Sequence, residues 1–183
     1  MSKKMLFPIV ALALAGLCCF SFFKPVAASD TRTEPTTIVL EDNELSINLT
    51  YTKSGGAWVV SQGSASGYLS QVATALDQDI STVFQDIRLV FAADYSKGSL
   101  SGYATNSAGN RVPVGVEYVR KAQNGDVVVF KDDKKHSCTG APCSCCDFVK
   151  DNSGGIKGCK CLGENDCHIT ANDQCNHKVE DSQ

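Results

Sequence analysis

The sequence predicts an α+β fold, in which an antiparallel β-sheet of about seven strands with one helical segment is followed by a small disulfide-rich C-terminal module. Apolar and polar residues alternate with the period of a β-strand in residues 36–62 and 87–131. Between these stretches, residues 66–85 repeat their apolar positions with the period of a helix. Eight of the ten cysteines follow residue 135. We therefore predict a globular domain over residues 29–135 and a cysteine-rich module over residues 136–183.

Residues 1–28 have the features of a signal peptide. Two lysines precede an uncharged apolar run over residues 5–23, and the small residues at 26–28 offer a cleavage site. We therefore expect a secreted or periplasmic protein. Because the apolar run is long enough to span a bilayer, an uncleaved anchor is one alternative, and a lipid on Cys18 or Cys19 is another. Contact with a membrane is expected only in these two cases.

The first part of the predicted domain contains three short strands, at residues 36–40, 45–52 and 57–62. The second of them alternates strictly between apolar and polar residues, which indicates one buried face and one solvent-exposed face. The separators at residues 41–44 and 54–56 are rich in acidic residues, asparagine and glycine, which favour turns. These features predict a three-stranded meander.

An amphipathic helical segment is predicted over residues 66–85. Its apolar stripe consists of Leu69, Val72, Ala73, Leu76, Ile80, Val83, Phe84 and Ile87. If the segment divides into two shorter helices, the sequence Asp77-Gln78-Asp79 is where it breaks. Further strands are predicted at residues 87–91, 99–105, 111–120 and 126–131, and Asn124-Gly125 favours a tight hairpin turn.

The composition argues against two classes of function. The formal net charge is −3, and the basic group formed by Lys131, Lys134 and Lys135 is interrupted by two aspartates. A nucleic-acid binder shows a strongly basic surface, so we exclude nucleic acid as a partner. Residues 29–135 contain neither histidine nor cysteine, so a histidine-activated nucleophile would need its base from the module. We predict no catalytic residue and no cofactor, and expect binding or structure rather than catalysis.

The C-terminal module cannot fold on apolar contacts alone. From Cys138 onward its large apolar residues are few: Phe148, Val149, Ile156, Leu162, Ile169 and Val179. Ordering the chain costs about 1.5 kcal/mol per residue, and burial of a few side chains returns only a small part of that sum. Cross-links or metal must therefore hold the module together, or it stays disordered.

Disulfides are the preferred explanation. An exported chain meets an oxidising compartment, and eight cysteines permit four bridges with none left over. The connectivity cannot be read from the sequence, but the adjacent Cys145 and Cys146 are expected to bond to different partners. The sequence thus predicts an exported, disulfide-stabilised binding or structural protein, whose partner is an unknown protein or other extracellular ligand.

The main alternative is a protein that binds zinc or copper through this module. The candidate ligands are Cys138, Cys143, Cys145, Cys146, Cys159, Cys161, Cys167, His168, Cys175 and His177, whose soft donor atoms suit these metals. A lesser alternative is thiol–disulfide exchange through the C-x-x-C arrangement that begins at Cys143 and ends at Cys146.

Overall fold

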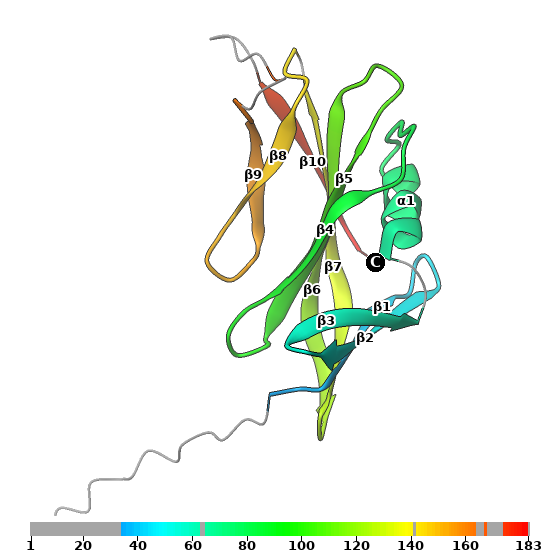
Figure 1. Ribbon diagram of the computed structural model, residues 1–183, viewed down its shortest axis with the longest axis vertical. Helices are drawn as coiled ribbons and strands as arrows, with labels where there is room; N and C mark the ends of the chain where they lie inside the picture. Colours follow the sequence, from blue (N-terminus) through cyan, green and yellow to red (C-terminus); the bar gives the residue numbers. More distant parts are fainter. Residues whose placement is uncertain (1–33, 63–64, 141, 164–166, 168–173, 183) are drawn as a thin grey trace, which may run out of the picture. The chain divides into compact units, whose positions relative to one another are not determined.

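The computed structural model describes residues 34–62, 65–140, 142–163, 167 and 174–182 (Figure 1). The predicted signal peptide, with Cys18 and Cys19, lies outside the described residues, and so does His168. The described part is mostly β-sheet, with ten strands, one helix of eleven residues and a disulfide-rich C-terminal region. No helix in this part of the chain combines the length and the apolar character needed to cross a bilayer.

The strands follow one another in three groups. The first group is β1 (Thr37–Asp42), β2 (Ile47–Ser54) and β3 (Ala57–Gln62), which precede helix α1 (Ala65–Ala75). The second is β4 (Gln85–Phe91), β5 (Lys97–Thr105), β6 (Arg111–Asn124) and β7 (Val127–Gly140). The cysteine-rich segment adds β8 (Cys146–Lys150), β9 (Ile156–Cys161) and β10 (Cys175–Asp181). The first seven strands lie where the alternation predicts strands, although β6 and β7 extend further.

Eight strands form one sheet in the order β3-β2-β1-β7-β6-β5-β4, and β10 joins it beside β7. The first three strands pair antiparallel with their neighbours in the sequence, so the predicted meander is confirmed. β1, however, runs parallel to β7, with Thr37 opposite Val127. The sheet is therefore mixed and nearly barrel-shaped, and the prediction of a purely antiparallel sheet is wrong. Alternation has the same period in parallel and antiparallel pairs, so it did not reveal this pairing.

Strand β7 is the central strand of the sheet (Figure 1). Along one edge, residues 127–131 pair with β1 and residues 134–140 pair with β10, while the other edge pairs with β6. The β6–β7 hairpin turns at Gly125, whose φ of 57° is a left-handed conformation that glycine adopts easily, as expected for the turn predicted at Asn124-Gly125. β7 continues across the predicted boundary between residues 135 and 136, so the predicted domain and the predicted module share this strand.

Helix α1 is shorter than the predicted segment over residues 66–85, because it ends at Ala75. The backbone amides of Asp77 and Gln78 donate to carbonyls of the last turn in a Schellman motif, and Asp77 has a φ of 54°. The predicted break therefore terminates the helix. Val83, which the prediction placed on the buried stripe, is 73% exposed.

The main core lies between α1 and one face of the sheet. The helix contributes Tyr68, Leu69, Val72 and Ala73, and the sheet contributes Ile38, Leu40, Leu49, Leu100, Val112, Val114, Val116, Val128 and Phe130. These residues occupy the inward positions of alternating strands and one stripe of the helix. The predicted stripe included Leu69, Val72 and Ala73 but not Tyr68.

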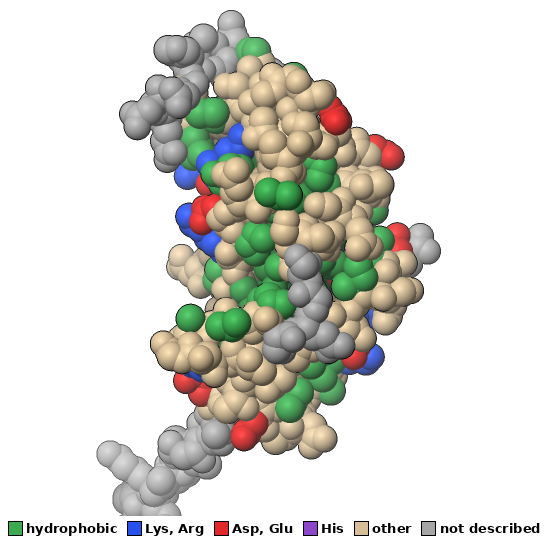
Figure 2. All heavy atoms as spheres, turned by 45° about the vertical axis from the view of Figure 1, so that its right-hand side comes forward, with side chains coloured by type: hydrophobic (Ala, Val, Ile, Leu, Met, Phe, Trp, Pro, Cys, Tyr) green, Lys and Arg blue, Asp and Glu red, His purple; other side chains and the backbone are tan. Residues whose placement is uncertain are grey.

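The barrel has a seam between β3 and β4, the two ends of the strand order, where the described residues form no ladder. The rings of Trp58 and Phe91 face each other across it, with centroids 6.3 Å apart. A cavity of about 380 Å³ opens at the seam, and Val60, Ile87 and Leu89 are among the residues that line it. Apolar side chains reach the surface across the middle of the face shown in Figure 2. Side-chain packing, rather than hydrogen bonding, brings these two edges together.

A buried cluster of charges joins β7 to β1 and α1. The Lys135 side chain is only 2% exposed, and its Nζ lies 3.3 Å from Asp132 Oδ2 and 3.5 Å from Asp42 Oδ2. Glu44 adds a half-exposed carboxylate to the same ammonium. Asp42 also accepts a hydrogen bond of 2.6 Å from the Tyr68 hydroxyl on the helix. Such buried charges are stable only together, since removal of the ammonium leaves the carboxylates without compensation.

Replacement of Lys135 by methionine is therefore expected to lower the free energy of unfolding by roughly 3–5 kcal/mol. The change leaves Asp42 and Asp132 buried near each other without a cation. Urea unfolding at neutral pH measures the difference, with Lys160→Met at an exposed position of β9 as the matched control. Equal stability of the two variants would contradict the role given to this cluster.

Candidate functional site

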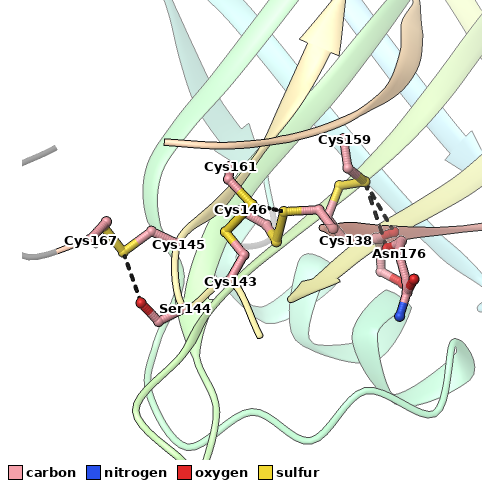
Figure 3. Close-up of a disulfide and its surroundings, with 11 residues drawn as sticks. Cys138, Cys143, Ser144, Cys145, Cys146, Cys159, Cys161, Cys167 and Asn176 are labelled. Atoms are coloured by element: carbon pink, nitrogen blue, oxygen red, sulfur yellow. Dashed lines mark hydrogen bonds between the residues drawn. A yellow bond between two sulfur atoms is a disulfide. The ribbon is translucent and has the colours of Figure 1, made fainter. Parts of the chain in front are cut away.

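All eight cysteines of the C-terminal segment are paired. The bridges are Cys138–Cys159, Cys143–Cys161, Cys145–Cys167 and Cys146–Cys175 (Figure 3). The predicted four disulfides are thus confirmed, and the adjacent Cys145 and Cys146 do bond to different partners. Three of the bridges, Cys138–Cys159, Cys143–Cys161 and Cys146–Cys175, gather in one cluster, and the Cys145–Cys167 bridge lies to one side of it (Figure 3).

This cluster fastens the β8–β9 hairpin to the main sheet. Cys138 on β7 is bonded to Cys159 on β9, and Cys146 on β8 is bonded to Cys175 on β10. Each strand of the hairpin therefore has its own covalent link to the sheet. The hairpin pairs only with itself in the described residues, so the sulfur links take the place that ladder hydrogen bonds have elsewhere.

The bridges also supply a second, small core. The side chains of Phe148 and Ile156 are buried among the cysteines, and the Sγ atoms of Cys161 and Cys175 lie 3.5 Å apart although they belong to different bridges. Cystine sulfur is apolar and polarisable, so it packs against aromatic and aliphatic groups. The segment therefore gains from its cysteines both cross-links and part of its buried apolar surface.

The predicted metal ligands are these same sulfur atoms. The Sγ atoms of Cys143, Cys161 and Cys175 all lie within 4.8 Å of one another, which is a spacing that suits a thiolate site. In the oxidised state each sulfur is bonded to another sulfur, and only a free thiolate is a strong metal ligand. Of the two histidine candidates, His177 lies on β10 beside His136 and His168 is outside the described residues.

The predicted C-x-x-C pair is divided between two bridges. Cys143 is bonded to Cys161, and Cys146 is bonded to Cys175. A thiol–disulfide exchange motif alternates between a dithiol and a bridge within the motif itself. The observed pairing instead gives each of the two cysteines a structural partner elsewhere in the segment.

The hairpin packs closely on β4, β5 and β6 at its turn. The Ser99 hydroxyl donates to the Gly154 carbonyl oxygen at 2.7 Å, and the Ile156 amide donates to the Glu117 carboxylate. Gly154 has a φ of 80°, and a Cβ at this position would lie 2.8 Å from a methyl carbon of Val90. Glycine is therefore required for both the turn and the close approach. This contact fixes the distance between the hairpin and the sheet.

A groove of about 210 Å³ lies between β8 and the sheet. It is lined by Asp86, Arg88 and Val90 of β4, Ser101, Gly102 and Tyr103 of β5, Arg111 of β6, and Asp147, Phe148 and Lys150 of β8. Residues from four strands thus meet in one place, and half of them carry a charge. The groove shares its concave shape and converging polar groups with small-molecule sites, but its lining is more highly charged than the mostly apolar lining that such sites have.

Arg111 is held rigidly in this groove. Its backbone amide donates to the Ser144 carbonyl at 2.7 Å, and the residue forms a β-bridge with Cys145, which is itself disulfide-bonded. The guanidinium lies 3.6 Å from the centroid of the Tyr103 ring, a cation–π contact. Its Nη2 is 3.7 Å from Asp147 Oδ1, while the buried Nε has no hydrogen-bond partner among the described residues.

Lys150 extends from the end of β8 toward the sheet. Its ammonium donates a hydrogen bond of 2.6 Å to the hydroxyl of Ser101, which is 5% exposed. Burial lowers the pKa of Lys150, and the nearby Arg88 adds to this effect, whereas Asp147 and Asp86 oppose it. In the part of the chain that the structure describes, no carboxylate is close enough to form a salt bridge with this ammonium. Lys150 is therefore a partly buried cation without a salt-bridge partner among the described residues.

None of the charged residues of this groove could be identified from the sequence. Arg88, Arg111, Asp147 and Lys150 come from separate strands and carry no motif spacing. They converge only because the strand order and the disulfides bring β8 against β4, β5 and β6. The one available signal, a charge next to apolar residues near a strand end, is too common to mark a site.

Behind the hairpin, two histidines stack on each other. The rings of His136 and His177 are 5.2 Å apart between centroids, with His136 Nδ1 3.0 Å from His177 Nε2, and Phe148 contacts both edge-on. His136 Nε2 lies 3.3 Å from a Glu117 carboxylate oxygen, without the geometry of a hydrogen bond. Because one ring nitrogen must accept the proton that the other donates, at least one of the two imidazoles is neutral in this contact.

Comparisons of the chain with protein-family models, with curated proteins and with solved structures find no match. The function is therefore inferred from the groove and from the disulfide cluster that shapes it.

The histidine stack makes stability depend on pH. Burial lowers the pKa of His136, as do His177 and Lys134, against the opposing effect of Glu117; burial also lowers the pKa of His177. The unfolded chain, with histidine pKa values of about 6.5, thus binds more protons near that pH than the folded chain. Stability is fully present above this value and falls as pH decreases through it.

The urea midpoint is therefore expected to drop between about pH 7.5 and about pH 5.5. The double variant His136→Gln/His177→Gln is expected to show a flatter dependence over the same range. Urea unfolding in buffers of equal ionic strength measures both midpoints. An identical slope in the parent protein and the double variant would rule out the stack as the cause.

Proposed function

We propose that this protein is an exported, disulfide-stabilised binding protein, and that its ligand occupies the groove between β8 and the main sheet. The observation that carries the proposal is the way the bridges build this groove. One wall belongs to the sheet and the other to a hairpin that the sulfur cluster attaches to it. The energy of four cross-links thus stabilises a concave surface lined by charged groups.

Export is part of the proposal. The predicted signal peptide supports it, and so do four disulfides, which persist in oxidising compartments and are rare in the cytosol. A secreted or periplasmic location fits a module that uses cross-links to compensate for a small apolar core.

The groups in the groove favour binding over catalysis. The buried hydroxyl of Ser101 accepts a hydrogen bond from the Lys150 ammonium, whereas the hydroxyl of a nucleophilic serine donates one to a base. Arg111 and Lys150 are fixed cations, which hold an anionic or polar ligand without reacting with it.

A second candidate is zinc or copper binding by the reduced cysteines, and one observation favours it. The Sγ atoms of Cys143, Cys161 and Cys175 are near enough to one another to act as ligands of one ion after reduction. The two candidates differ in the oxidation state that they require, so one measurement on the purified protein separates them.

That measurement is the intact mass of the protein purified from a host that exports it. Under denaturing conditions the mature chain is expected to be lighter than its reduced form by the eight hydrogens that four bridges remove. N-terminal sequencing is expected to start near Ser29. Eight free thiols, with zinc or copper found by elemental analysis of the native sample, would favour the second candidate.

Removal of one bridge tests whether the disulfides hold the groove. The double variant Cys146→Ala/Cys175→Ala is expected to lose about 2–5 kcal/mol of stability. Hydrogen exchange is expected to quicken in β8 and β9, with the β1–β2 ladder unchanged. Unchanged exchange in the hairpin would show that packing alone positions this wall of the groove.

A further inference from the structure

The charges of the groove do not balance. Three cations, Arg88, Arg111 and Lys150, face two carboxylates, Asp86 and Asp147. Arg88 is paired with Asp86 at 2.6 Å, and Arg111 lies 3.7 Å from Asp147. Lys150 remains without a carboxylate among the described residues, so the groove carries an excess of one positive charge.

Hydrogen-bond donors are also left over at the same place. An ammonium has three N–H groups, and the described structure uses one of those of Lys150, in the bond to Ser101. The Nε–H of Arg111 is buried and has no partner in the described residues. The free N–H groups of the Lys150 ammonium are the donors that an anionic ligand in the groove would satisfy.

The rest of the lining is partly apolar. Phe148 of β8, which is 6% exposed, and Val90 of β4 both line the groove, and the Arg111 guanidinium lies over the Tyr103 ring. A fully hydrated inorganic ion gains little from such walls. A ligand with one charged end and a small apolar body satisfies both parts of the surface.

We propose, on the basis of the binding function inferred above, that the groove binds a small organic acid through a single carboxylate. The carboxylate accepts hydrogen bonds from the Lys150 ammonium and the Arg111 guanidinium, and the apolar body of the ligand contacts Phe148 and Val90. One negative charge neutralises the excess charge of the groove. A phosphate carries between one and two negative charges at neutral pH and therefore fits less well.

The disulfides have a direct part in this recognition. Arg111 is positioned through its contacts with Ser144 and Cys145, and Lys150 ends the strand that begins at Cys146. Both cations thus depend on bonded cysteines for their place in the groove. Ligand recognition is consequently expected only in the oxidised protein.

Titrations followed by NMR of the ¹⁵N-labelled, oxidised mature protein test the proposal. The probes are benzoate, its neutral analogue benzamide, and inorganic phosphate, each at constant ionic strength. Benzoate is expected to shift the amide signals of Arg111, Phe148 and Lys150, and to bind more tightly than the other two probes. Lys150→Met, which nearly preserves side-chain volume, is expected to weaken benzoate binding at least about tenfold.

Two further variants complete the test. Arg111→Gln is expected to weaken benzoate binding to a similar extent, and Lys121→Met, an exposed lysine at the far end of β6, is expected to leave it unchanged. Spectra that match the parent outside the groove confirm that each variant is folded. Undiminished benzoate binding by Lys150→Met would overturn the assignment of the carboxylate to this ammonium.

The probes also separate this inference from the proposed function. Benzamide binding as tightly as benzoate would leave a ligand-binding groove but overturn the recognition of an anion. Tighter binding of phosphate would overturn the choice of a carboxylate. If no probe shifts any groove signal, both the inference and the placement of binding in this groove are overturned, and the disulfide measurements then stand alone.

Discussion

Covalent bonds between sulfur atoms hold in place a segment that has too little apolar surface to fold by itself. The β8–β9 hairpin forms no ladder with the main sheet in the described residues, and its buried apolar side chains are Cys146, Phe148 and Ile156, with Cys159 and Cys161 partly buried beside them. Its position therefore depends on the bridges and on the close contact at Gly154. The groove, and the cations within it, follow from that position.

The rest of the molecule has an ordinary apolar core, and a buried cluster of charged residues lies beside it. Lys135 and its carboxylates lie where β7 passes from its pairing with β1 to its pairing with β10. A buried ammonium with several carboxylates accepts few alternative arrangements, because any shift leaves a charge unpaired. We infer that the cluster helps the core to set the register of β1 and β10 against β7.

The strands and turns could be predicted from the sequence, because each depends on residues that are close together in the chain. The seven strands before Cys138 follow from alternation, and the meander from its turn residues, because one buried face imposes a period of two. The parallel pairing of β1 with β7 joins segments far apart in the chain, so no turn sequence between them indicates it. The end of α1 depended on whether Asp77 would adopt a left-handed conformation, which aspartate tolerates but does not require.

Four bridges followed from counting cysteines, but their partners depend on which strands are neighbours. The groove was beyond prediction for the same reason, since Arg111 and Lys150 meet only after folding.

The placement of β10 has a consequence for how the protein matures. This strand completes the edge of β7, and Cys175 within it is the partner of Cys146. Until this last stretch is available, the chain has an unpaired strand edge on β7 and a free thiol at Cys146, and both favour association with other chains. Closure of the sheet and completion of the cross-links therefore wait for the arrival of residues 175–181. A product that ends before residue 175 would keep an unpaired strand edge on β7, and such an edge favours aggregation.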